Sequence, residues 1–149
     1  MMGSKPVRIV CATLLGALVL GSCSSAYDIR AVSIDGHLAF EPLETDVWGN
    51  PDCVKWIEVT AIDGPLEGDG RIVWTRGRSN GPCELDFPIA YGGHADDDPS
   101  ATSYGPKPLV RGLTYEVVAL SPGSAYGGGR FRMTEEGEVE NLPLTYDQP

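Results

Sequence analysis

The chain has 149 residues and a formal net charge of −10, from 21 acidic and 11 basic side chains. Nucleic acid and anionic lipid headgroups are poor candidate partners for such a chain, because both need a basic surface that displaces counterions. A chain of this length is expected to form one domain with a single hydrophobic core.

Residues 1 to 22 have the properties of an export signal. Lys5 and Arg8 make its first part positive, and the apolar run 9–20 that follows is too short to span a hydrocarbon core of about 30 Å. The sequence therefore predicts a signal peptide and not a transmembrane helix.

The signal ends in Leu20-Gly-Ser-Cys23, which resembles the lipobox of bacterial lipoproteins. The resemblance implies cleavage before Cys23 and acylation of this cysteine with chains such as palmitate, so that residues 23–26 form a short lipidated tether. Ser24 is the residue type typical of lipoproteins of the outer membrane, which implies that location in the cell envelope. The alternative is ordinary signal-peptidase cleavage between residues 22 and 26, which would release a soluble periplasmic protein.

Removal of residues 1–22 takes away two basic residues and no acidic one, so the 127 residues that remain carry a formal charge of −12. Residues 27–149 are expected to form the folded domain. Its charge favours an envelope protein with a basic surface as the partner, and nucleic acid is not expected.

Two cysteines, Cys53 and Cys83, remain once Cys11 leaves with the signal and Cys23 is acylated. A cysteine pair left over in an exported chain predicts a disulfide. The bond would close a loop of about thirty residues and stabilise the domain by about 3 kcal/mol, mainly by restricting the unfolded chain. The alternative is a pair of free, buried thiols.

Eight runs of residues have the composition or the alternation of β-strands, and none has the period of a helix. The clearest alternation runs from Cys83 to Tyr91 and predicts a strand with its apolar face on the core. Asp35 and Gly36 predict a hairpin turn between the first two runs. The runs are 27–34, 37–41, 54–62, 71–75, 83–91, 109–120, 130–133 and 138–142.

Leu109, Gly112 and Tyr115 have a spacing that resembles fibronectin type III and other immunoglobulin-like domains. The resemblance implies that the tyrosine hydroxyl bonds back to the preceding turn. Together with the strand count, it predicts an all-β fold, a single antiparallel β-sandwich of immunoglobulin-like type. A small closed β-barrel is the alternative.

Few residues are candidates for catalysis or metal binding. His37 follows a hairpin turn and is expected to be solvated, and His94 lies in the segment 92–108, the longest without strand character. The acidic run in this segment consists of Asp96, Asp97 and Asp98. These carboxylates could coordinate calcium, but they lack the spacing of an EF-hand loop. Gly127–Gly129 lacks the helix and lysine of a phosphate-binding loop, so a loop or bulge is expected there. We expect neither a cofactor nor a metal.

Two tyrosines, Tyr104 and Tyr126, lie among glycines and small polar residues in the predicted loops. Loop tyrosines supply contact area at low entropic cost. If the strands that end at Tyr91 and Leu120 point to one end of the domain, these tyrosines and the aspartates 96–98 form one acidic recognition surface. The alternative is that each tyrosine packs on its own loop.

A non-enzymatic binding or accessory lipoprotein of the bacterial envelope is therefore the expected function. One alternative is an inhibitor of a basic enzyme such as lysozyme, because Ser121–Tyr126 is similar to the Ser-Gly-x-x-Tyr element of small lipoproteins that inhibit lysozyme, with Pro122 inserted. The other alternative is an envelope hydrolase, although no pair of carboxylates stands out among the 21 acids.

The lipobox resemblance makes Cys23 the anchor. Substitution of Cys23→Ala is expected to abolish acylation and to release the protein from the membrane fraction, because no other residue would carry acyl chains. Mass spectrometry of the wild-type protein tests the premise directly, and an unlipidated wild type would contradict it.

Overall fold

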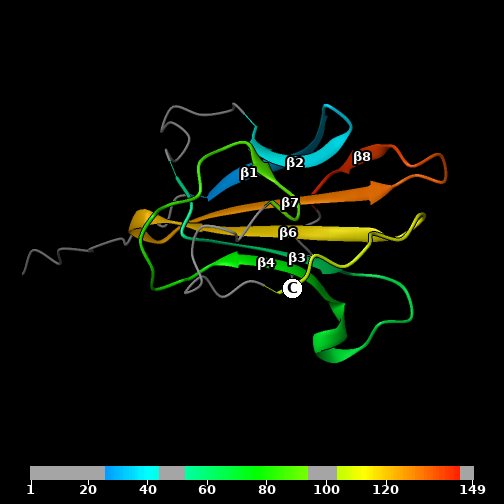
Figure 1. Ribbon diagram of the computed structural model, residues 1–149, viewed down its shortest axis with the longest axis horizontal. Helices are drawn as coiled ribbons and strands as arrows, with labels where there is room; N and C mark the ends of the chain where they lie inside the picture. The colour runs from blue at the N-terminus through cyan, green and yellow to red at the C-terminus, as the bar shows by residue number, and fades with distance from the viewer. Residues whose placement is uncertain (1–25, 44–52, 94–103, 145–149) are drawn as a thin grey trace, which may run out of the picture.

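The computed structural model describes residues 26–43, 53–93 and 104–144, whose strands form a single sheet (Figure 1). The prediction of an all-β domain with about eight strands is confirmed. Among the described residues, no helix is long and apolar enough to cross a bilayer. The strands are β1 (Ala26–Ile34), β2 (His37–Pro42), β3 (Trp56–Ala61), β4 (Ile72–Gly77), β5 (Ile89–Ala90), β6 (Thr114–Ser121), β7 (Ala125–Met133) and β8 (Val139–Leu142), with short 3₁₀ turns η1 (Gly68–Arg71) and η2 (Pro122–Ser124).

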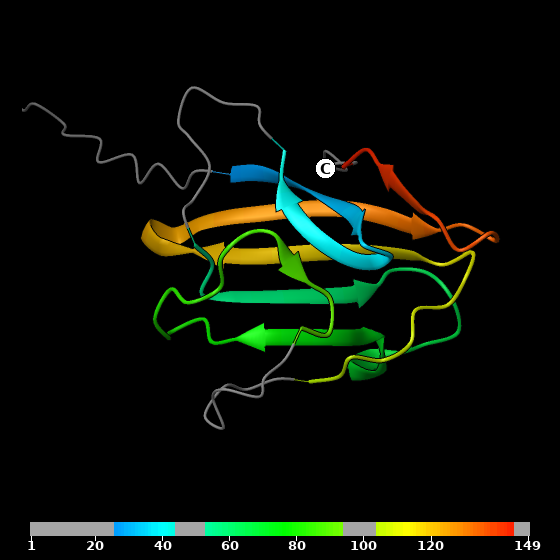
Figure 2. The ribbon, with the colours of Figure 1, turned by 45° about the horizontal axis from the view of Figure 1, so that its top comes forward.

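The strands follow the order β4-β3-β6-β7-β1-β2-β5, and β8 also pairs with β7. The sheet curls into a half-barrel, and in the view of Figure 2 β2 and β5 lie in front of β3, β6 and β7. All pairs are antiparallel except β1 with β7, which is parallel, so the prediction of a purely antiparallel sheet is wrong at this pair. The described strands form an open path and not the closed barrel of the alternative.

Strand β1 belongs to both halves of the curl. Its first residues pair with β7, with Ala26 opposite Tyr126 and Asp28 opposite Gly128. From Ile29 onward it pairs instead with β2. The sheet therefore folds over on itself where β1 changes partner.

The close approach of β1 to β7 depends on glycines in β7. A Cβ atom at Gly129 would lie 2.0 Å from the carbonyl oxygen of Ile29, and one at Gly127 would lie 2.4 Å from the ring of Tyr27. Glycine in a strand is typical of a position where another backbone comes close. The expectation of a loop or bulge at Gly127–Gly129 is therefore wrong, because these residues lie inside a strand.

The core lies inside the curl and joins its two halves. Alternate residues of β6 and β7 point inward, among them Tyr115 and Phe131. Phe40 of β2 packs against Phe131 and Trp74, with ring centroids 5.6 and 6.2 Å apart. All four aromatic side chains are at most 1% exposed, so their burial favours the curled arrangement.

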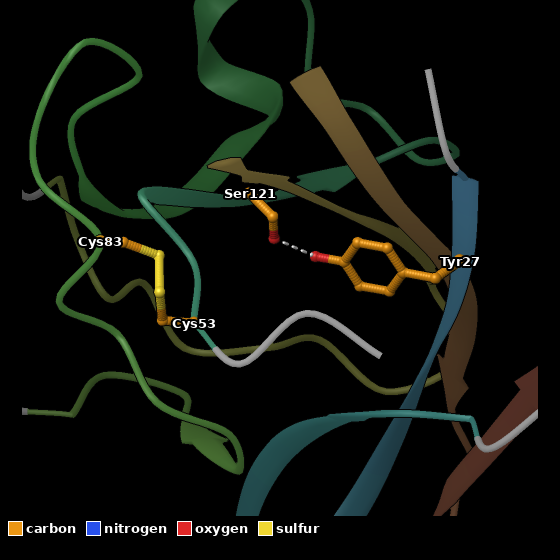
Figure 3. Close-up of a disulfide and its surroundings, with 4 residues drawn as sticks. All are labelled: Tyr27, Cys53, Cys83 and Ser121. Atoms are coloured by element: carbon orange, nitrogen blue, oxygen red, sulfur yellow. Dashed lines mark hydrogen bonds between the residues drawn. A yellow bond between two sulfur atoms is a disulfide. The ribbon is translucent and has the colours of Figure 1, made fainter. Parts of the chain in front are cut away.

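Cys53 and Cys83 form a disulfide with their Cα atoms 5.6 Å apart, which confirms the predicted pair (Figure 3). Beside it, Val54 and Leu85 exchange two backbone hydrogen bonds of 2.8 and 3.1 Å. Both of these residues are buried. The disulfide thus fixes the segment that follows β4 to the start of β3.

The run from Cys83 to Tyr91 is not the continuous strand that its alternation predicts. Only Ile89 and Ala90 form a strand, since the disulfide region pairs Leu85 with Val54 and Pro88 has no N–H to donate to a ladder. Leu85 and Ile89 are nevertheless buried, so the predicted inward face is right.

The hydroxyl of Tyr115 accepts a hydrogen bond of 2.7 Å from the backbone N–H of Val110. This bond is the tie to the turn that the spacing of Leu109, Gly112 and Tyr115 predicts. Burial raises the pKa of the Tyr115 hydroxyl above its ordinary value.

The contact between Ile29 and Gly129 can be tested with a neighbouring glycine as the control. Substitution of Gly129→Ala is expected to destabilise the domain strongly, because the backbone of β1 would have to move. Gly128→Ala should have a small effect, since its Cβ would meet only Leu144, at 3.8 Å. Thermal unfolding measures both, and equal melting temperatures for the two variants would contradict the crossing of β1.

Reduction of the Cys53–Cys83 bond is expected to lower the free energy of unfolding by about 3 kcal/mol, because the unfolded chain gains freedom. For a domain of this size the melting temperature should fall by roughly 10 °C. The Cys53→Ser, Cys83→Ser double variant should show the same fall without reductant. Two titratable thiols in the native protein would contradict the bond.

Candidate functional site

The described residues hold no group of three or more histidine, cysteine, aspartate or glutamate side chains that could bind a metal ion. His37 is exposed on β2, in agreement with a solvated role. His94 and the aspartates Asp96, Asp97 and Asp98 lie outside the described residues, as does Cys23.

Aromatic and apolar side chains gather on the outer face of the sheet, the side of β3, β6 and β7 that points away from the core. Trp56 lies directly opposite Leu120, and Leu120 lies opposite Tyr126. Side chains of directly opposed residues share a face and contact one another. We call these three residues the outer row. Trp56 and Leu120 are partly exposed, and Tyr126 is 53% exposed.

Tyr104 joins this face at the edge of β4. Its backbone exchanges hydrogen bonds of 2.9 and 3.3 Å with Thr75, which lies opposite Glu58 of β3. Because opposed residues share a face, Tyr104 lies on the outer side together with Thr75 and Glu58. Its side chain is 45% exposed, and the Nζ atom of Lys107 lies 4.9 Å from the ring centroid.

Acidic side chains border the outer row. Glu58 and Glu116 belong to the same face because they are separated from Trp56 and Leu120 by even numbers of residues. Glu116 accepts a hydrogen bond of 3.1 Å from Arg130 Nε, and Glu58 accepts one of 3.2 Å from Thr60. Such partly exposed pairs add little stability, so these groups act mainly as surface charge.

The structure places one of the two predicted tyrosines differently from the sequence expectation. Tyr126 lies in β7 and not in a loop, because Gly127–Gly129 continue the strand. β5 and β6 run in opposite directions along the sheet, so the strands that precede the two loops do not end at the same side. Tyr104 and Tyr126 nevertheless flank one face, with β3, β4 and β6 between them.

The alternative in which each tyrosine packs on its own loop does not hold for Tyr126, which is in a strand and more than half exposed. Sequence analysis did not predict that Trp56 lies on the outer face of the sheet. The signal was the alternation of β3, which buries Ile57, Val59 and Ala61 and leaves Trp56 on the opposite face.

Ser121, which begins the element that is similar to the lysozyme-inhibitor motif, is 1% exposed. Its hydroxyl and that of Tyr27 form a hydrogen bond of 2.8 Å, shown in Figure 3. Ser121 therefore has a structural contact that links β6 to β1 and is not open to a partner.

Comparison with protein-family models, curated proteins and solved structures gave no match for this chain. The chemistry of its own surface is therefore the basis for assigning a function. The outer face, with its row of Trp56, Leu120 and Tyr126 and with Tyr104 at its edge, is the strongest candidate for a binding surface, because exposed aromatic groups of this kind are typical of protein interfaces.

Proposed function

We propose that this chain is a non-enzymatic binding or accessory lipoprotein, anchored through acylated Cys23 in the outer membrane of a bacterial cell envelope. The outer face of the sheet is its recognition surface. The observation that carries the proposal is the arrangement of Tyr104 and Tyr126 at two sides of one face that has Trp56 and Leu120 between them. Aromatic anchors of this kind dominate the free energy of many interfaces.

The partner is an envelope protein with a basic surface. The mature chain carries a formal charge of −12, and carboxylates of Glu58 and Glu116 border the outer row. Complementary charge raises the association rate and excludes acidic partners, so binding should weaken as the salt concentration rises.

We also infer that the curled sheet is an immunoglobulin-like sandwich whose two layers stay joined through β1. The strand order supports this: β1, β2 and β5 correspond to A, B and E of such folds, and β3, β6 and β7 to C, F and G, with β4 at the edge. The bond from Val110 N–H to the Tyr115 hydroxyl supports it as well, because a tyrosine at the start of strand F makes this contact.

Envelope extract passed over the immobilised chain should yield a partner whose binding depends on the outer face. Tyr104→Ala and Tyr126→Ala are each expected to weaken binding of the captured protein by about 1 kcal/mol or more, with the melting temperature little changed. Val110→Ala is the control, since Val110 is 54% exposed and lies in the turn before β6. Affinity of the purified partner for each variant is the measurement.

Several results would contradict this function. Unchanged affinity of both tyrosine variants, or a loss that follows unfolding, would reject the surface. A captured partner of the lysozyme type would favour the inhibitor alternative, and turnover of an envelope substrate would favour the hydrolase. Binding of the Cys23→Ala protein to lipid vesicles that is lost with Tyr126→Ala would assign the outer row to lipid instead of protein.

A further inference from the structure

A shallow pocket of about 250 Å³ lies at the edge of the outer face, where β4 ends. Its lining includes Trp56 of β3 and Thr75 and Gly77 of β4. The turn that follows β4 completes the lining with three polar residues, Arg78, Ser79 and Asn80. The volume is below the roughly 300–1,000 Å³ of sites for drug-sized ligands, so it suits a single small ring.

Gly77, which lines the pocket, lies directly opposite Trp56. Gly77 pairs directly with Trp56 and has φ +85°, and a Cβ atom there would lie 2.2 Å from the carbonyl oxygen of Lys55. A residue with a side chain does not fit that backbone, so the strand requires glycine at this place in the pocket lining. Trp56 itself is partly exposed.

The turn that carries the polar groups is held to the sheet. Arg78 N–H donates a hydrogen bond of 2.8 Å to the carbonyl oxygen of Lys55, and Gly81 N–H donates one of 3.0 Å to that of Arg78. Two residues further on, Cys83 is bonded to Cys53. The pocket is therefore largely preformed, and ordering it costs a ligand little free energy.

The charge in the pocket is opposite to that of the chain. Arg78 is exposed, and its guanidinium group makes no hydrogen bond or ion pair with any described residue. Guanidinium binds carboxylate through two parallel hydrogen bonds. A saccharide ring has apolar faces and hydroxyl groups along its edge. A ring that also carries a carboxylate matches this lining, because the pocket offers the aromatic residue Trp56, the guanidinium group of Arg78, and the hydroxyl and amide groups of Ser79 and Asn80.

We propose that this pocket binds one ring of an acidic saccharide. The apolar face of the ring packs on Trp56, its carboxylate pairs with Arg78, and its hydroxyls bond to Ser79 and Asn80. This site shares Trp56 with the outer row and extends from it to the turn after β4, so it goes beyond the proposed protein-binding function. Only the choice of probe rests on the proposed function, because an envelope location selects an acidic sugar of the bacterial cell wall.

The main probe is N-acetylmuramic acid. N-acetylglucosamine represents its neutral sugar, and lactate represents the part of it that bears the carboxylate. The full chain, labelled with ¹⁵N and held in detergent micelles, is titrated with each probe. The indole N–H signal of Trp56, identified with Trp56→Phe, reports on the pocket. N-acetylmuramic acid is expected to shift this signal saturably and to bind more tightly than either of the other probes.

Arg78→Ala should weaken binding of N-acetylmuramic acid about tenfold, because a charge-assisted hydrogen-bonded pair is lost. Arg78→Lys should lie between this variant and the wild type, and Arg132→Ala, an exposed arginine of β7 outside the pocket, should bind as the wild type does. Dispersion of the remaining amide signals shows that each variant is folded.

No shift of the Trp56 signal would overturn the proposal, as would equal affinity for the acid and the neutral sugar. Equal affinity for lactate and the acid would identify an anion site without saccharide recognition and would also overturn it. Arg78→Ala should leave capture of the protein partner unchanged, and Tyr126→Ala should leave saccharide binding unchanged, so that either proposal can fail alone.

Discussion

The fold depends on the backbone contact between β1 and β7. Gly127 and Gly129 leave no side chains on the inner side of β7 at this point, so β1 can pair with β7 and then turn across it toward β2. This crossing brings Phe40 onto Phe131 and Trp74, and the aromatic core closes around it. A side chain at Gly129 would separate the two strands, and the inner surface of the sheet would lose its cover.

The aromatic residues of the sheet divide between two faces with different roles. Trp74, Tyr115 and Phe131 are buried and hold the curl together, whereas Trp56 and Tyr126 lie outside on the neighbouring strands. The division follows from the alternation of side chains along each strand. One sheet therefore supplies both the hydrophobic core and an exposed surface with aromatic anchors, without requiring a long loop to carry them.

Local pattern was sufficient to predict where most strands lie in the chain. The alternation from Cys83 to Tyr91 predicts that Leu85 and Ile89 are buried, and the cysteine pair follows from counting. The sequence could not predict the parallel contact of β1 with β7, because the two strands are far apart in the chain and their pairing depends on a close approach that only the folded backbone defines.

Dependence on contacts between distant strands also explains why the predicted positions of the surface aromatic residues were partly wrong. Gly127–Gly129 have the composition of a loop, so Tyr126 was expected in one, although the glycines are there to admit β1. The outer row could not be predicted either, because it requires the register that sets Trp56 opposite Leu120 and Leu120 opposite Tyr126. Register between distant strands is decided by the packing of the whole sheet.

In the lipoprotein that we propose, strand β1 would also determine how far the outer row can reach from the membrane. Ala26, its first residue, is the direct neighbour of Tyr126 across the parallel pair. With acyl chains on Cys23, only three residues separate the bilayer from this strand, and they span about 10 Å at full extension. A partner that is itself held at the membrane surface would meet the row at a high effective concentration, so that a weak contact would be enough to keep it occupied. A partner that diffuses freely through the periplasm gains nothing from this confinement.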